Sequence, residues 1–393
     1  MCSKDKGRYA TVYGATAMGG QLIDGEEHGG SDDACFSSLN PACRGDVVGI
    51  FPQASQEDVE AAVRAAGRAC ESWKAVPDAQ RGQIIADFGR LLGEHRQDLA
   101  RLLTREVGLL HPESLTEIQE IIDTACDPQA ASSESGPPEG VSLVISTIRF
   151  PLALPGCQLV ADLLCGNTVV WNPSAGAPTV GWALGRLLVQ AGVPAGVINI
   201  LHGDGQLGES LMQQLDQGLV QKVAAGSDSF AGTPLVVTDE ADLELLVKNT
   251  LRPGFGGRRR SGRIILLRKI AEAFRTKFLR AVQEMSIGDP TLNRQVCYGP
   301  LPGQKYLDSF LAHYDLVASE GAELLYGKGR ISRDNKPRDF TGDPDLGYFV
   351  WPAIWGKVDS GMKLAQQEVF GPVVSLIEVD DIDEALAFMP NQG

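Results

Sequence analysis

Eight cysteines are the first residues to test for chemistry, because a thiolate can serve as a nucleophile, a metal ligand or half of a disulfide. They lie at positions 2, 35, 43, 70, 126, 157, 165 and 297. None forms a C-x-x-C pair, and none has a metal-ligand spacing with one of the five histidines. We therefore interpret them as reduced thiols and expect neither a metal site nor a disulfide framework.

A glycine pattern at residues 203–208 could bind phosphate. Gly203, Gly205 and Gly208 fit G-x-G-x-x-G, which is typical of a dinucleotide-binding loop when it lies between a strand and a helix. No clear acidic partner for a ribose follows about 20 residues further on. The sequence thus favours a structural turn over a pyrophosphate cradle, and both interpretations stay open.

The charge balance limits the classes of partner. The chain has 50 acidic and 35 basic residues and a formal charge of −15, which argues against affinity for nucleic acid or an anionic membrane. The one basic cluster, at 258–260 with Arg263 close by, is interpreted as a solvated loop in preference to an anion site. No apolar run reaches membrane-spanning length and the N-terminus has no secretory signal, so we expect a cytoplasmic protein.

The elements that must position these residues follow two patterns. Helical periodicity begins at Ser55, where a capping box is expected, continues from about Asp78, and recurs over 113–126. Residues 1–35 show no clear period, and 127–140 are interpreted as a loop. From 141 to 215 strands alternate with helices, and a second such region spans 233–379, which predicts βαβ units and parallel sheets.

Several segments, in order, resemble the aldehyde dehydrogenase superfamily. They occupy 40–66, 150–174, 191–205, 239–247, 347–355 and 367–385. The resemblance implies an α/β fold with a Rossmann-type parallel-sheet cofactor domain and a second α/β catalytic-type domain. We expect an irregular segment over 1–35, an NAD(P)-binding-type domain over 36–228, and a catalytic-type domain over 229–393. The family continues beyond the position where this chain ends, so the last domain is expected to be incomplete, truncated at the C-terminus.

The resembled family oxidises aldehydes to acids with NAD or NADP, using a cysteine nucleophile, an oxyanion donor and a glutamate base. The loop that matches the nucleophile loop, residues 255–262, contains no cysteine. Arg149 occupies the position of the family's asparagine donor, and gapless counting puts Asp228 at the position of the glutamate. The resemblance therefore leaves no catalytic group intact, and only these two remnant positions.

Some of the family's cofactor-contacting residues are matched in this sequence and others are replaced. In the family, a lysine and a glutamate of the Trp-Lys-Pro-Ser-Glu motif reach the adenosine ribose, but here Asn172 and Ala175 replace them. The helix whose N-terminus would face the pyrophosphate is missing after Ser227. The positions that the resemblance assigns to the cofactor are Trp171, Asn172, Ser174, Gly205, Gly208, Gly226, Ser227, Glu368 and Phe370. We expect binding of NAD or NADP to be weak or lost.

Four interpretations remain. The first is a non-catalytic member that keeps the scaffold, and the second is an active NAD(P)-dependent dehydrogenase of small aldehydes with unusual residues. The third is a regulatory or binding subunit that forms a hetero-oligomer with an active relative. A faulty gene model or a decaying gene is the fourth. A homo-oligomer of the family's type is in doubt, because residues 127–145 are too short and polar for the family's hairpin arm.

Overall fold

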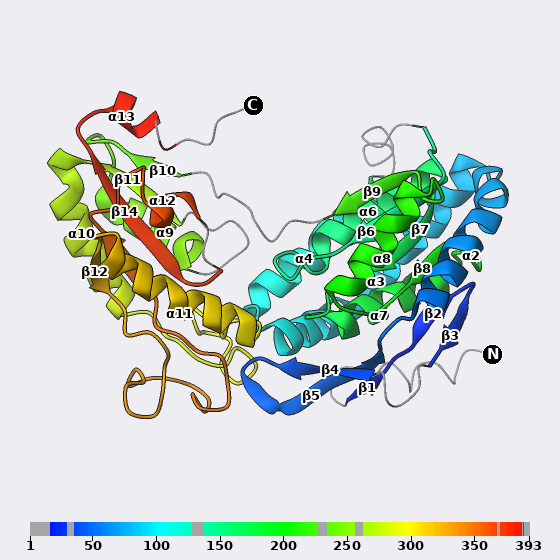
Figure 1. Cartoon of the computed structure of the whole chain (residues 1–393), viewed down its shortest axis with the longest axis horizontal. Coiled ribbons are helices and arrows are strands. Elements are labelled where there is room, and N and C mark those ends of the chain that lie inside the picture. The colour runs from blue at the N-terminus through cyan, green and yellow to red at the C-terminus, as the bar shows by residue number, and fades with distance from the viewer. Residues whose placement is uncertain are drawn as a thin grey trace. The chain divides into compact units, whose positions relative to one another are not determined.

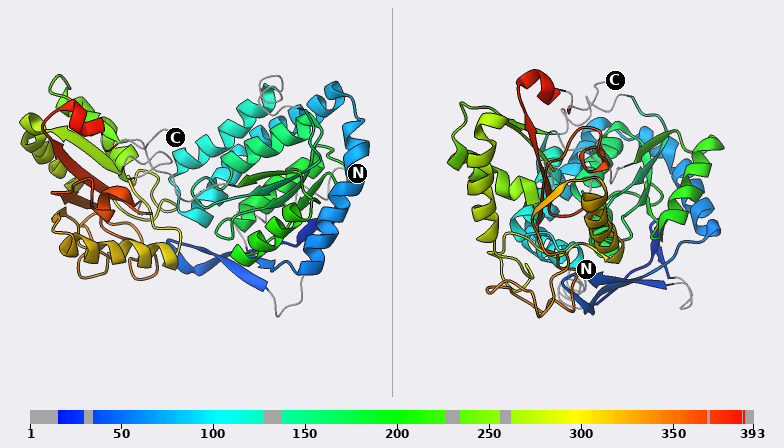
Figure 2. Two further views of the ribbon diagram at one scale, coloured as in Figure 1. Left: turned by 45° about the horizontal axis from the view of Figure 1, so that its top comes forward. Right: turned by 60° about the vertical axis from the view of Figure 1, so that its left-hand side comes forward.

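The computed structural model describes residues 16–29, 35–127, 137–225, 234–255, 262–367, 370–386 and 388 (Figure 1). The chain divides into two compact units. Unit 1 comprises residues 1–40, 45–107 and 111–228, and unit 2 comprises 41–44, 108–110 and 229–393. Each unit has its own sheet with helices packed on it (Figure 2).

Unit 1 is built on a six-stranded sheet with the order β3-β2-β8-β7-β6-β9. Its parallel strands are β6 (Val141–Ile145), β7 (Thr168–Asn172), β8 (Ile198–Ile200) and β9 (Lys222–Ala225). A hairpin of β2 (Gln21–Ile23) and β3 (Glu26–His28) adds two antiparallel strands beside β8. The strand order and the intervening helices are those of a Rossmann-type sheet.

Helices cover both faces of this sheet. α2 (Gln56–Lys74) and α8 (Gly205–Asp216) share an apolar core with one face, which includes Leu143 and Val170. α6 (Ala153–Cys165) and α7 (Pro178–Gln190) follow β6 and β7. The Asp162 carboxylate of α6 accepts a hydrogen bond from Ser142, the β6 residue that alternates with Leu143, so α6 covers the opposite face. α3 (Asp78–Val107) and α4 (His111–Cys126) pack on α6 and α7.

Local sequence explains where these helices begin and end. Ser55 and Asp58 form the capping box that the sequence predicts at the start of α2, so this prediction is confirmed. Gly166 ends α6 in the left-handed region at φ 94°, a conformation that glycine adopts without steric cost. Pro178 lies at the first position of α7, where its missing N–H is not needed.

A smaller sheet in the chain's first part has the order β1-β5-β4, from β1 (Ala17–Met18), β4 (Cys35–Asn40) and β5 (Cys43–Pro52). The sequence predicts no regular structure over 1–35, but β1, β2 and β3 all lie there. They have two or three residues each. Strands this short show no measurable alternation, and pairing with longer neighbours defines them. Of the loop expected over 127–140, residues 128–136 lie outside the described residues.

Unit 2 contains a five-stranded sheet with the order β10-β11-β14-β13-β12. The strands are β10 (Leu235–Val237), β11 (Arg263–Leu267), β12 (Glu323–Tyr326), β13 (Ala353–Gly356) and β14 (Val373–Val379), and only β12 is antiparallel to its neighbour. The helices are α9 (Leu243–Phe255), α10 (Arg268–Gln283), α11 (Gln304–Ser319), α12 (Lys363–Gln366) and α13 (Ile382–Leu386). Fully buried Phe274, Phe310 and Trp355 lie in its core. The α/β fold predicted from the sequence is confirmed.

Candidate cofactor and catalytic positions

The carboxyl edge of the unit 1 sheet is where ligands bind in open α/β folds, and the predicted motif lies there. β7 ends at Asn172, which is buried. Its side-chain amide donates to the carbonyl oxygen of Leu201 at 3.0 Å and to that of Pro173 at 3.2 Å. Both amide hydrogens are therefore used inside the fold, and the amide does not act as the ribose donor that a lysine at this position would supply.

The neighbouring residues of this motif are also engaged or apolar. The indole N–H of fully buried Trp171 donates to the Ser146 hydroxyl at 2.7 Å. The hydroxyl oxygen of Ser174 accepts from the N–H of Gly176 at 3.3 Å. Ala175 is exposed and has no polar side-chain group. The described residues of the motif thus carry no charge that could hold a ribose.

The helix N-termini at this edge are the other features that commonly bind a dinucleotide, because their free N–H groups attract phosphate. At α6, fully buried Glu117 accepts from the N–H groups of Leu152 at 3.2 Å and Ala153 at 2.7 Å. At α7, buried Glu106 accepts from those of Thr179 and Val180, each at 2.8 Å. Each of these two helix N-termini is therefore already satisfied by an internal carboxylate.

At α8, which follows the glycine pattern, the N-cap is Asp204. Its carboxylate accepts from the N–H of Gln206 at 3.1 Å and from the Gln53 amide at 3.2 Å. A carboxylate in this place repels phosphate. Thus α6, α7 and α8, the helices that follow β6, β7 and β8, all have an acidic group at their N-terminus. The corresponding segment after β9 falls in 226–233, outside the described residues.

The glycines of the pattern differ in what the fold requires of them. A methyl group on Gly203 would lie 2.8 Å from the Leu207 side chain and 2.9 Å from the Gln53 amide, so these two side chains would have to shift to accommodate it. A methyl group on Gly205 or Gly208 would meet nothing within 4 Å. Packing against the described residues therefore does not require a glycine at either of these two positions.

The remaining predicted positions are distributed over both units. Arg149 is buried and lies in the segment between β6 and α6, on the same edge as Asn172. Phe370 lies in unit 2 against Tyr306 of α11, with ring centroids 4.5 Å apart. The positions Gly226, Ser227, Asp228 and Glu368 lie outside the described residues, as does the nucleophile-type loop at 256–261.

Cys297 is the first cysteine after that loop, and it belongs to unit 2. Its N–H donates to the carbonyl oxygen of Ser286 at 2.9 Å, and the Ser286 hydroxyl lies 3.5 Å from its sulfur.

Among the described residues, no group of three or more His, Cys, Asp or Glu side chains is placed so that it could hold a metal ion. Nor does any helix in the described ranges have the length and apolar character to cross a bilayer. The cytoplasmic location stays a prediction.

Sequence reasoning missed the three carboxylates at the helix N-termini. Asp204 precedes the first residue of α8 and has the residue type that caps helices, so this signal was available. Glu106 and Glu117 lie within or at the end of other helices, 73 and 36 positions away from the N–H groups of Thr179 and Ala153. Only the folded chain brings them together.

Two α/β units, the first with a parallel sheet and βα crossovers, define the scaffold of a dinucleotide-dependent oxidoreductase. The model of the aldehyde dehydrogenase family matches residues 28–229 and 231–392, and the chain belongs to that family. The resemblance found in the sequence is therefore confirmed.

The relatives and structural neighbours agree with this assignment. The chain is 30% identical over 394 residues to alpha-ketoglutaric semialdehyde dehydrogenase of Bacillus subtilis. This alignment covers 88% of this chain and 78% of the relative. The chain is 31% identical over 392 residues to alpha-ketoglutarate semialdehyde dehydrogenase of Haloferax volcanii, with the same coverage. The fold matches that of betaine aldehyde dehydrogenase from Staphylococcus aureus in complex with NAD+, with a TM-score of 0.85, 23% identity, and coverage of 98% of this chain and 82% of that one.

Proposed function

We propose that this aldehyde dehydrogenase family member keeps the scaffold and lacks dehydrogenase activity. The observation that carries the proposal is that no cysteine occurs between Cys165 and Cys297. That interval contains the whole region in which the family's nucleophile is expected. Without a thiolate the carbonyl carbon is not attacked, so no tetrahedral adduct forms from which hydride could leave.

The oxyanion position supports the same proposal. Arg149 replaces the family's asparagine, and its longer side chain puts its N–H groups at a different distance from the backbone. A donor must lie about 2.7–3.1 Å from the developing oxyanion to stabilise it, and loss of one such donor costs about a hundred- to a thousand-fold in rate. Two independent changes therefore act against the same chemical step.

The cofactor positions support weak or absent binding of NAD or NADP. The side chain of Asn172 is used within the fold, Ala175 has no charge, and α8 is capped by Asp204. The described residues thus fit the dinucleotide poorly at the ribose, and we derive no reaction step through it.

The proposed substrate and partner come from the relatives. The two relatives named above are dehydrogenases of alpha-ketoglutaric semialdehyde, so this is the aldehyde to offer first. A chain that keeps the scaffold and binds no cofactor can still associate with an active relative. We propose that the two form a hetero-oligomer. Co-purification of tagged chain with the active relative, compared with an unrelated tagged protein, tests that association.

The first prediction concerns turnover. With alpha-ketoglutaric semialdehyde and either NAD or NADP, we expect the rate of NADH or NADPH formation to be at least about a thousand-fold below that of an active relative. Absorbance of the reduced nicotinamide measures this, and the Bacillus subtilis relative under the same conditions is the positive control. Saturable formation of NADH above background would contradict the proposal, and loss of that activity in Cys297→Ser would identify the thiol responsible.

The second prediction concerns the dinucleotide alone. Isothermal titration calorimetry with NAD and with NADP is expected to show no saturable binding below about 1 mM, because the ribose contacts are absent. The active relative, titrated in parallel, controls for cofactor quality. A dissociation constant in the micromolar range would contradict this prediction.

A further inference from the structure

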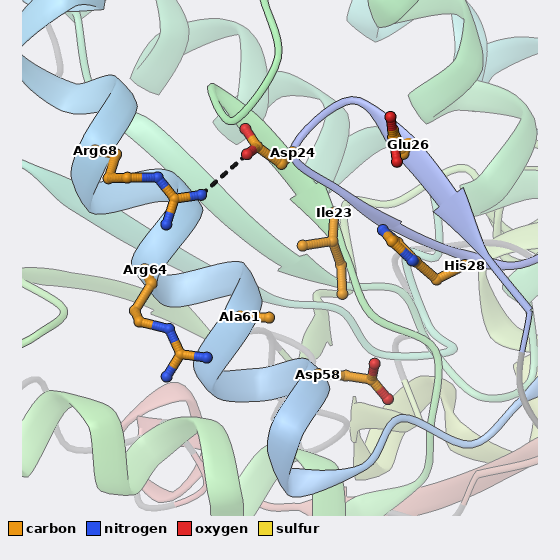
Figure 3. Close-up of a pocket in the computed structure, with 8 residues that line it drawn as sticks. All are labelled: Ile23, Asp24, Glu26, His28, Asp58, Ala61, Arg64 and Arg68. Atoms are coloured by element: carbon orange, nitrogen blue, oxygen red, sulfur yellow. Dashed lines mark hydrogen bonds and ion pairs between the residues drawn. The ribbon is translucent and has the colours of Figure 1, made fainter.

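A polar cavity of about 470 Å³ lies in unit 1 between the β2–β3 hairpin and helix α2, away from the candidate cofactor positions. Figure 3 shows the residues that line it. Its charged or titratable side chains are Asp24, Glu26, His28, Asp58, Arg64 and Arg68, and Ile23 and Ala61 contribute apolar surface. A cavity of this volume is in the range of small-molecule sites, which are mostly apolar. The charged lining of this one favours a ligand that is itself charged.

The periodicity of each element directs these side chains to the cavity. Asp58, Ala61, Arg64 and Arg68 are spaced by three or four residues and form one stripe along α2. On β3, Glu26 and His28 alternate with Glu27, so they face the cavity side of the strand. Glu27 points the other way, where its carboxylate accepts from the Trp182 indole at 3.1 Å and from Arg186.

The two guanidiniums of the cavity lie on one wall, and carboxylates lie on both: α2 contributes Asp58 with Arg64 and Arg68, and the hairpin contributes Asp24 and Glu26. Arg64 and Arg68 extend from α2, and Glu26 lies across from them on the hairpin (Figure 3). Arg68 is paired with Asp24 at 2.9 Å, and Arg64 with Glu60 at 3.2 Å. The Arg64 side chain is 60% exposed and the Arg68 side chain is 63% exposed. Exposed pairs of this kind contribute about 0–1 kcal/mol, so a ligand anion can share or displace them at little cost.

We propose that this cavity binds a small zwitterion with a carboxylate at one end and an ammonium group at the other, such as an amino acid. The carboxylate binds the Arg64 and Arg68 guanidiniums, whose planar donors suit carboxylate oxygens. The ammonium group binds the Glu26 carboxylate, which makes no salt bridge with any residue in the described ranges. Methylene groups between the two ends lie on Ile23 and Ala61.

Other ligand classes fit the charges less well. A dianion would bring its second negative charge to the Glu26 side of the cavity. A simple cation could contact the Asp24, Glu26 or Asp58 carboxylate, but it would give the Arg64 and Arg68 guanidiniums no new partner. A metal ion is disfavoured because no cluster of ligating side chains exists among the described residues. The proposal is independent of the question of dehydrogenase activity, because none of the lining residues is a candidate cofactor or catalytic position.

The test is calorimetric titration of the whole chain with a matched set of probes. Glycine and 6-aminohexanoate are the zwitterions, of short and long reach, and hexanoate, hexylamine and adipate carry one or two like charges on the same carbon chain. We expect saturable binding of at least one zwitterion, and at least tenfold weaker binding of the other three compounds. Adipate binding as tightly as the better zwitterion, or no binding by either zwitterion, would overturn the proposal.

Single variants then assign the binding to this cavity. Arg64→Gln and Glu26→Gln are each expected to weaken zwitterion binding at least tenfold, since each removes one of the two ionic contacts. Arg90→Gln is the matched control, because Arg90 is 58% exposed and pairs with Glu94 four residues away, as Arg64 pairs with Glu60. Equal affinity in Glu26→Gln and in the unmodified chain would refute the ammonium contact. Unchanged melting temperatures show that the three variants are folded.

Discussion

Replacing Glu106 by alanine is expected to destabilise unit 1 by about 3–5 kcal/mol. The Glu106 carboxylate is 1% exposed. One oxygen accepts from the Ser38 hydroxyl at 2.7 Å and the Thr179 N–H at 2.8 Å, and the other accepts from the Val180 N–H at 2.8 Å. Alanine leaves these three donors buried without an acceptor, and it uncaps α7. Burial raises the pKa of Glu106, although its hydrogen bonds oppose that shift.

Denaturant unfolding followed by circular dichroism measures the effect. Glu94→Ala is the control, because Glu94 lies on the same helix, is 56% exposed, and pairs with the exposed Arg90 at 2.6 Å. That change is expected to cost about 1 kcal/mol or less. Glu106→Gln should lose an intermediate amount of unfolding free energy. Its amide oxygen can still accept hydrogen bonds, but its amide nitrogen replaces the other oxygen and faces a donor. If Glu106→Ala lost no more stability than Glu94→Ala, the carboxylate would not be the cap that the structure shows.

The second large effect is acid destabilisation through His202. The side chain is fully buried against Phe51, with ring centroids 4.5 Å apart, and neither ring nitrogen has a hydrogen-bond partner among the residues that the structure describes. Burial lowers the pKa of His202 from 6.5 to about 3. The folded chain therefore requires the neutral imidazole. The stability that this provides is complete above pH 6.5 and is lost as the pH falls toward 3, by about 2 kcal/mol at pH 5.

The comparison that isolates this effect is the pH dependence of His202→Phe, which keeps a planar ring but cannot be protonated. Between pH 7 and pH 5 the unmodified chain should lose about 2 kcal/mol more unfolding free energy than the variant. The difference between the two chains is needed because Glu106, whose pKa is raised, gains a proton over the acid range and works in the opposite direction. Parallel pH profiles would show that folding does not lower the pKa of His202.

Much of the fold was accessible from the sequence because its signals are local. Alternating strands and helices predicted the sheet of β6, β7 and β8, and the capping box predicted the start of α2. α9 was not predicted as a helix, because Pro253 and Gly254 near its end obscure the helical pattern. Tertiary packing outweighs those propensities.

The candidate site was less accessible, because it depends on contacts between distant residues. The sequence showed that Asn172 replaces a lysine, but only the structure shows that its amide binds the carbonyl oxygen of Leu201, 29 residues away. The carboxylates of Glu106 and Glu117 could not be assigned to helix N-termini, since neither is near those helices in sequence. The sequence therefore shows that a positive charge is missing at position 172, but it does not show which groups the Asn172, Glu106 and Glu117 side chains bind.

Unit 2 contains two short pieces from the first third of the chain, residues 41–44 and 108–110. The N–H of Arg44 donates to the carbonyl oxygen of Leu346 at 2.9 Å, and the N–H of Tyr348 donates to that of Pro41 at 3.0 Å. During synthesis on the ribosome, residues 41–44 emerge roughly 300 residues before their partners, at about 5–20 residues per second. Unit 2 therefore has a high contact order and completes its folding only after its late strands have been synthesised, and a fragment starting at residue 229 lacks the early segments that belong to it.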